Sequence, residues 1–253
     1  MENKTKKALE FFKNKDYEKA ISEFKELLTE IPNDCAILNN IGLCYLKLGQ
    51  NDEAEEYFLR ALSNNSKSVE TYVNLSDIYY SEKRIAEAIN LLETAVTLLP
   101  QNIVLLHYLA RIYIEDVRYD LAIDMLSRIL DISPENIDAY WDLGNIYYEL
   151  GEYENAAASF EHVLEKRDNN EIFFYQTGLA YEGANITDKA LSNFLKAIAV
   201  NSEFSPAYKK AAIMFLAQGD KESAKEYLED YINFDLPEEE KQNIKSVIEN
   251  ISK

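Results

Sequence analysis

The sequence is poor in glycine and proline, with 7 and 5 residues in a chain of 253. So few turn-forming residues argue against a many-stranded sandwich or barrel and favour helices. Lysine and arginine are also scarce, 26 against 45 aspartates and glutamates, which gives a net charge of −19. Because nucleic acids and anionic membrane surfaces attract basic proteins, we expect neither as a partner.

Cysteine, histidine and long apolar runs are also limited. Cys35 and Cys44 are too few for a disulfide scaffold and fit a reduced, cytoplasmic protein. The sequence has no apolar run long enough for a transmembrane helix and no hydrophobic segment typical of a secretory signal. His107 and His162 have no metal-site spacing, and no glycine-rich phosphate motif occurs. We therefore expect no metal, no cofactor and no catalytic activity.

An internal repeat of 34 residues runs through the chain, and internal periods of this length indicate stacked helical units. An alanine recurs at this spacing: Ala20, Ala54, Ala88, Ala122, Ala156, Ala190 and Ala224. A small residue lies twelve positions before each alanine: Ala8, Gly42, Ser76, Ala110, Gly144, Gly178 and Ala212. A large apolar residue lies four positions after each alanine: Phe24, Phe58, Leu92, Leu126, Phe160, Phe194 and Leu228.

A further position, three residues after each small residue, is always aromatic: Phe11, Tyr45, Tyr79, Tyr113, Tyr147, Tyr181 and Phe215. The seven repeats fill residues 1–238, as 1–34, 35–68, 69–102, 103–136, 137–170, 171–204 and 205–238. Each repeat has room for two helices of about 13 residues and a short turn. Small residues on both helices allow the two backbones to approach closely near that turn.

The turn between the two helices has a common position that favours a left-handed backbone. Glycine or asparagine occupies it in four repeats: Gly49, Gly151, Asn185 and Gly219. Lys15, Lys83 and Val117 occupy it in the other three, so we expect those turns to be strained or closed differently. Three prolines are expected to stop second helices: Pro32, Pro100 and Pro134.

This pattern resembles the tetratricopeptide repeat (TPR), whose consensus the segment from Ala139 to Ala156 follows closely. The resemblance implies an all-α fold, a right-handed α-solenoid of seven helix-turn-helix repeats, with the first helices lining a concave groove. Pentatricopeptide repeats, which bind RNA, are the nearest alternative. Their period is one residue longer and their groove is usually basic, so the constant spacing and the acidic charge argue against them.

Both ends of the solenoid are expected to be closed. Lys4 and Lys7 occupy positions that are apolar in the later repeats. Residues 239–253 are predicted to form a C-terminal capping helix over the seventh repeat. Its apolar stripe consists of Ile244, Val247, Ile248 and Ile251. We therefore expect a complete chain without an appended catalytic domain.

The resemblance places partner binding in the groove. Asn40 and Asn74 share one groove position in consecutive repeats and predict a short ladder for an extended peptide backbone. The other candidates gather aromatic and charged side chains in repeats three to six: Asp77, Tyr80, His107, Tyr108, Arg111, Trp141, Asp142, Asn145, Tyr148 and Tyr175. Aromatic residues beside arginine are frequent binding hot spots. The alternative is that these tyrosines pack between helices.

The resemblance implies a non-catalytic scaffold or adaptor that binds a peptide or helix of a partner protein. The family's carboxylate clamp for chaperone C-termini has no matching window, since Trp141 stands where the clamp has a lysine. The fifth repeat is the most acidic and the early groove positions are apolar, which favours an amphipathic or basic segment as partner. Two alternatives stay open: a self-assembling structural homo-oligomer, and a regulatory subunit of an enzyme complex.

Overall fold

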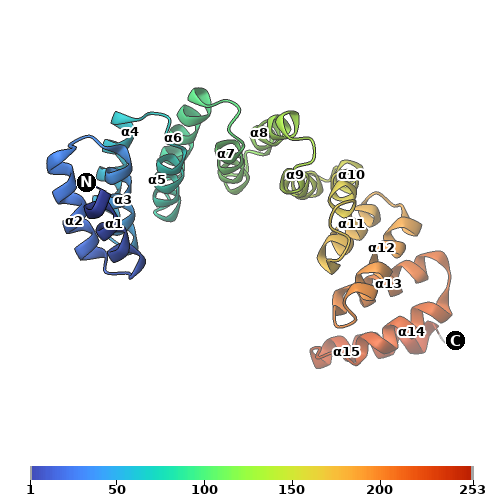
Figure 1. Ribbon diagram of the computed structural model, residues 1–253. Helices are drawn as coiled ribbons and strands as arrows, with labels where there is room; N and C mark the ends of the chain where they lie inside the picture. The colour runs from blue at the N-terminus through green and yellow to red at the C-terminus, as the bar shows by residue number, and fades with distance from the viewer. Residues whose placement is uncertain (1, 252–253) are drawn as a thin grey trace. The chain divides into compact units, whose positions relative to one another are not determined.

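The structure is a computed structural model that describes residues 2–251 (Figure 1). Residues 1, 252 and 253 lie outside this part, so the predicted capping helix 239–253 extends two positions beyond it. All regular structure in the described residues is helical, which confirms the all-α fold. None of these helices is long and apolar enough to cross a membrane.

The helices divide between two compact units, residues 1–134 and residues 135–253. The first unit contains α1 (Glu2–Lys13), α2 (Tyr17–Glu30), α3 (Cys35–Lys47), α4 (Asn51–Asn64), α5 (Val69–Ser81), α6 (Ile85–Leu98), α7 (Ile103–Glu115) and α8 (Tyr119–Ile132). The second contains α9 (Ile137–Glu149), α10 (Tyr153–Leu164), α11 (Glu171–Gly183), α12 (Thr187–Val200), α13 (Ser205–Gln218), α14 (Lys221–Ile232) and α15 (Glu238–Ile251).

In each unit an odd-numbered helix pairs with the even-numbered helix that follows it, and consecutive pairs stack within the unit. Four first helices begin at a side-chain cap that accepts a backbone N–H: Asp34, Asn102, Asn136 and Asn170. The second helices α2, α6 and α8 end two residues before Pro32, Pro100 and Pro134, as predicted. The predicted helix-turn-helix arrangement is confirmed.

The turn inside every pair has one backbone geometry. The predicted turn position has a positive φ in all seven pairs: Lys15, Gly49, Lys83, Val117, Gly151, Asn185 and Gly219. The backbone amide of the next residue donates to the backbone carbonyl of the aromatic residue that recurs in each first helix. In the third pair, for example, the Arg84 amide donates to the Tyr79 carbonyl at 2.8 Å. Of the two outcomes expected for Lys15, Lys83 and Val117, a strained turn or a differently closed one, the structure shows the strained one. These three residues adopt the left-handed backbone.

In three pairs the two helices approach closely where a glycine of the first helix faces a phenylalanine of the second. A Cβ atom added to Gly144 would lie 2.4 Å from Phe160 Cε1, and one added to Gly42 would lie 2.6 Å from Phe58 Cε1. Gly178 stands in the same relation to Phe194. Where the small residue is alanine or serine, the facing residue is leucine in three repeats: Ser76–Leu92, Ala110–Leu126 and Ala212–Leu228. The first repeat is the exception, with Ala8 and Phe24. Glycine is thus paired with the larger phenylalanine ring.

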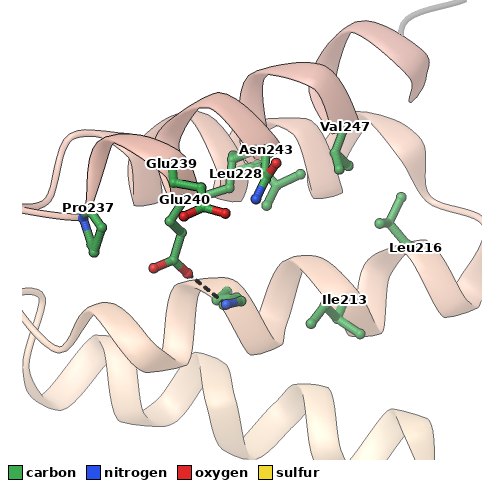
Figure 2. A pocket seen from close by; sticks show the side chains of 10 residues that line it. Ile213, Leu216, Leu228, Pro237, Glu239, Glu240, Asn243 and Val247 are labelled. Atoms are coloured by element: carbon green, nitrogen blue, oxygen red, sulfur yellow. Dashed lines mark hydrogen bonds and ion pairs between the residues drawn. The ribbon is translucent and has the colours of Figure 1, made fainter.

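The helix α15 packs against the seventh pair with part of its predicted apolar stripe. Ile244 is buried in a cluster with Leu228 and Tyr231, and Ile248 and Ile251 pack against that cluster. Val247 is 40% exposed and does not belong to the cluster. Within the predicted stripe, Val247 thus differs from the three isoleucines, because it lies on the flank of α15 that faces α13 (Figure 2).

The close contact at Gly144 can be tested with a double-mutant cycle. We expect Gly144→Ala to lower the free energy of unfolding by about 1–3 kcal/mol, because the methyl group overlaps the Phe160 ring. In a Phe160→Leu background the same change should cost little, since alanine faces leucine at the equivalent positions of other repeats. Denaturant unfolding of the four proteins measures the coupling. Equal costs of Gly144→Ala in both backgrounds would contradict the contact.

The backbone strain at Val117 can be tested by exchanging the residue types of positions 117 and 185. Val117 has a φ of 58°, Asn185 has a φ of 59°, and the Val117 side chain is 67% exposed. Asparagine tolerates the left-handed region better than a β-branched residue does, so Val117→Asn should raise the free energy of unfolding by about 1 kcal/mol. Asn185→Val should lower it by a similar amount. Stabilisation by both changes, or by neither, would contradict this explanation.

Candidate functional site

In the first unit, three predicted binding residues lie together on the first helices α5 and α7. The guanidinium carbon of Arg111 lies 4.7 Å from the centre of the Tyr108 ring. Its Nη2 atom lies 3.4 Å from Oδ1 of Asp77 on the neighbouring first helix. The side chains of Arg111 and Asp77 are 53% and 48% exposed, so both are accessible to a partner.

Arg111 does not fully stabilise the charged form of Asp77. Partial burial raises the pKa of Asp77, and the nearby Arg111 only partly opposes that effect. The distance of 3.4 Å between the two charged groups is also longer than that of a strong charge-assisted hydrogen bond. A second cation beside Asp77 would therefore stabilise its carboxylate.

Two further candidates flank this cluster. Tyr80, on α5, is half-buried, and Nζ of Lys83 lies 5.9 Å from its ring centre. His107 precedes Tyr108 on α7 and is also half-buried. Each of these side chains keeps part of its surface accessible, and their role in binding stays a prediction.

The predicted asparagine pair has a different arrangement from the one expected. Nδ2 of Asn74 donates to Oδ1 of Asn39 at 3.5 Å, and the Thr71 hydroxyl donates to the same oxygen at 3.0 Å. Asn39 is only 5% exposed. The buried residue Asn39, which is not among the predicted binding residues, thus joins α3 to α5. Asn40 lies at the edge of a polar hollow of about 400 Å³ that Asn39 and Ser68 also line.

In the second unit the aromatic candidates pack against the core. Trp141, on α9, contacts Phe160 and Phe173, with ring centres 5.2 and 4.9 Å apart. Tyr175, on α11, lies 5.6 Å from Phe194 and 5.2 Å from Phe204 by the same measure. Burial raises the pKa of the Tyr175 hydroxyl. These two rings contribute to packing, so their substitution would disturb the fold as well as any binding.

The remaining candidates of the second unit lie beside those rings. Tyr148, also on α9, makes an edge contact with Tyr153 at 5.4 Å between ring centres. Asn145 donates its side-chain amide to the backbone carbonyl of Trp141 at 2.9 Å, which occupies one of its donors. Asp142 is half-buried on the same helix. Their role in partner binding stays a prediction.

The thiols show no sign of activation. Cys44 is fully buried, and burial raises the pKa of its thiol to about 12. The reactive thiolate is therefore strongly disfavoured at neutral pH. Cys35 is half-buried, and both cysteines are unpaired. No group of three or more histidine, cysteine, aspartate or glutamate side chains that fits a metal ion occurs within residues 2–251.

Family comparisons agree with the helix pairs described above. Tetratricopeptide repeat models match residues 33–101, 79–129, 114–173 and 207–234. The chain belongs to the tetratricopeptide repeat family. Proteins with TPR solenoids serve in general as scaffolds for contacts between proteins.

Known TPR proteins resemble this chain in fold more than in sequence. The C-terminal part of a TPR repeat-containing protein from Cytophaga hutchinsonii has a TM-score of 0.78 at 21% identity, covering 95% of this chain and 98% of that one. YrrB, described as a TPR protein with an unusual peptide-binding site, has a TM-score of 0.66 at 21% identity, covering 76% of this chain and 99% of its own. Sperm-associated antigen 1 of Rattus norvegicus is 44% identical over 63 residues, which are 25% of this chain and 7% of the rat protein.

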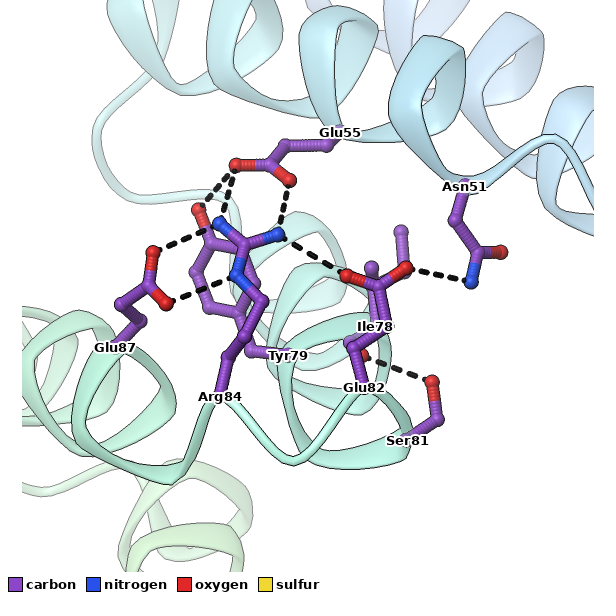
Figure 3. A network of polar contacts seen from close by, with 8 residues as sticks. All are labelled: Asn51, Glu55, Ile78, Tyr79, Ser81, Glu82, Arg84 and Glu87. Atoms are coloured by element: carbon purple, nitrogen blue, oxygen red, sulfur yellow. Dashed lines mark hydrogen bonds and ion pairs between the residues drawn. The ribbon is translucent and has the colours of Figure 1, made fainter.

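A polar cluster that the sequence pattern did not single out connects the second and third TPR pairs (Figure 3). Nη1 of Arg84 lies 2.6 Å from Glu55 Oε2 and 3.1 Å from Glu82 Oε2, and Nη2 lies 2.8 Å from Glu87 Oε1. The guanidinium also stacks on Tyr79 at 4.2 Å, and the Tyr79 hydroxyl donates to Glu55. Because the guanidinium is saturated by three carboxylates, this cluster holds the pairs together and leaves no cation for a ligand.

Similar bridges recur at the aromatic position of other TPR pairs. A tyrosine hydroxyl there bonds to a charged side chain on the second helix of the preceding pair: Tyr45 with Lys25, Tyr113 with Glu93 and Tyr181 with Glu161. The sequence did contain a signal for these bridges, because tyrosine recurs at a position where packing needs only an aromatic ring. Polar bridges at this position join consecutive pairs within each unit.

The Arg84 cluster predicts a pH dependence of stability. Hydrogen bonding from Arg84 lowers the pKa of Glu55 below 4.5. A lowered folded pKa gives stability that is present above about pH 4.5 and is lost as the pH falls through the folded value. We expect Glu55→Gln to lower the free energy of unfolding at pH 7 by about 1–2 kcal/mol, with the difference vanishing as the pH falls through the lowered folded pKa of Glu55.

The control for this measurement is Glu56→Gln at the neighbouring position. Glu56 lies 3.9 Å from Arg60, and its side chain is 68% exposed, so its removal should change stability little at any pH. Denaturant unfolding across the pH range compares the variants. A Glu55→Gln effect independent of pH would contradict the ion-pair explanation.

Proposed function

We propose that the chain is a non-catalytic scaffold that binds a peptide or helix of a partner protein on the face formed by its first helices. The family supports protein binding in general. The cluster of Asp77, Tyr108 and Arg111 carries the proposal because it combines an aromatic ring with two accessible charges on adjacent first helices. Hot spots of protein interfaces are enriched in tyrosine and arginine.

The partner segment is proposed to be basic or amphipathic. The raised pKa of Asp77 supports this, because an added cation would stabilise its charged form. The net charge of −19 would also speed the approach of a basic segment. The unpaired cysteines support a cytoplasmic setting, since that compartment keeps thiols reduced.

Arg111 and Arg118 offer a matched comparison for testing this face. Both are exposed arginines above tyrosine rings, Arg111 over Tyr108 and Arg118 over Tyr113 at 5.0 Å. Arg118 lies at the turn between α7 and α8, away from the neighbouring first helix. A change at Arg118 therefore removes the same charge and the same kind of stacking from another face.

The test is quantitative affinity capture from the source cell with three baits: wild type, Tyr108→Ala/Arg111→Ala and Arg118→Ala. We expect a bound protein to be retained by the wild type and by Arg118→Ala, and to bind the double variant at least about tenfold more weakly. Circular dichroism checks that all baits keep equal helicity. Identical captures by the three baits would contradict the proposed face, and capture of the bait alone would favour self-assembly.

A further inference from the structure

The second unit contains an apolar pocket of about 600 Å³ between α13 and α15 (Figure 2). Ile213 and Leu216 line it from α13, Val247 and Ile244 line it from α15, and Leu228 of α14 lies behind them. Ile213 and Val247 are 39% and 40% exposed. Pockets of this volume, apolar with a few polar groups, are typical of binding sites.

The pocket stays open because α15 buries only one flank of its apolar surface. Ile244, Ile248 and Ile251 pack toward the cluster that includes Leu228, whereas Val247 faces Ile213 and Leu216 across the hollow (Figure 2). On α13, Ile213 is exposed and Leu216 is half-buried. Covering these exposed side chains with an apolar group would be favourable in proportion to the area removed from water.

One end of the pocket is acidic. Lys209 Nζ lies 2.7 Å from Glu240 Oε1, and the Tyr231 hydroxyl donates to the same oxygen at 3.0 Å. The hydrogen bond from Lys209 lowers the pKa of Glu240, so that carboxylate is already compensated. Glu239 also lines the pocket, is exposed, and has no ion pair with any residue in the described range 2–251. Its negative charge at the edge of an apolar hollow is therefore available to a cation.

We propose that this pocket binds a basic amphipathic segment of a partner protein, with apolar side chains between Ile213 and Val247 and a lysine or arginine beside Glu239. The inference rests on the proposed function, because it assumes that the chain binds protein segments. Charge complementarity identifies the occupant, since the open carboxylate and the chain's net charge of −19 both favour a basic segment. An amphipathic helix would present its apolar side chains at i and i+3 or i+4.

The probe is a phage-displayed library of random peptides about twelve residues long, selected on the wild-type chain. The double variant Ile213→Gln/Val247→Gln serves for counter-selection. Both positions are about two-fifths exposed, so glutamine there leaves the buried cluster intact. We expect the selected peptides to combine two apolar residues three or four positions apart with a lysine or arginine within one turn.

The best selected peptide is then synthesised, and its affinity is measured by fluorescence anisotropy. We expect binding to weaken at least about tenfold for Ile213→Gln/Val247→Gln and about threefold for Glu239→Gln, with the latter loss screened by salt. Ile172→Gln is the control, because Ile172 is 45% exposed in the same unit but does not line the pocket. The Ile172→Gln variant should bind the peptide with the same affinity as the wild type.

Three results would overturn the proposal. The first is that no peptide binds the wild type better than the double variant, and the second is that the selected peptides lack basic residues. The third is self-association of the wild type that the double variant abolishes in sedimentation velocity, since a second copy would then be the occupant. A cellular partner that depends on Tyr108 and Arg111 but not on Ile213 and Val247 would support the proposed function and overturn this inference alone.

Discussion

The close approach of the two helices in three of the pairs depends on one contact, that of a glycine on the first helix with a phenylalanine on the second. At Gly144 the ring of Phe160 occupies the space where a side chain would begin. This approach brings the helix ends near enough for a short turn. The turn hydrogen-bonds to the backbone of the recurring aromatic residue, whose side chain bridges to the preceding pair where it is a bonded tyrosine. The stacking of pairs within each unit depends on that order of contacts.

The repeat and its helix boundaries were predictable because they depend on residue types at fixed spacing. The left-handed backbone at Lys15, Lys83 and Val117 was predictable only as one of two outcomes, a strained turn or a differently closed one, since none of these residues favours it. Neighbouring contacts decide it: the aromatic carbonyl of the same repeat receives the amide that follows the turn. The hydrogen bond that closes the turn thus overrides residue preference at these three positions.

The candidate site was predictable in part. The pattern placed Asp77 and Arg111 at the same position of consecutive repeats, and the structure brings them to 3.4 Å. It did not show that Trp141 would lean on Phe160 and Phe173, because the direction of a half-buried side chain depends on its neighbours in the next helix. The open flank at Val247 likewise depends on how α15 rotates about its axis, which the apolar spacing alone does not determine.

The polar side chains of the surface divide into two groups with different roles. Arg84 bonds to three carboxylates at once and holds helix pairs together. Asp77 and Glu239 have weaker or no compensation and lie beside exposed aromatic or apolar groups. The same acidic residue types therefore serve the scaffold at one position and are available for recognition at another.

The pairing of glycine with phenylalanine also restricts how such a sequence changes over generations. At Gly42, Gly144 and Gly178 an added methyl group would overlap the facing ring, so alanine there requires that the ring shift or be replaced by leucine. A smaller side chain in place of the ring would leave a cavity beside the glycine. The first pair holds Ala8 and Phe24 in one buried cluster, so the close fit differs from repeat to repeat within the same chain.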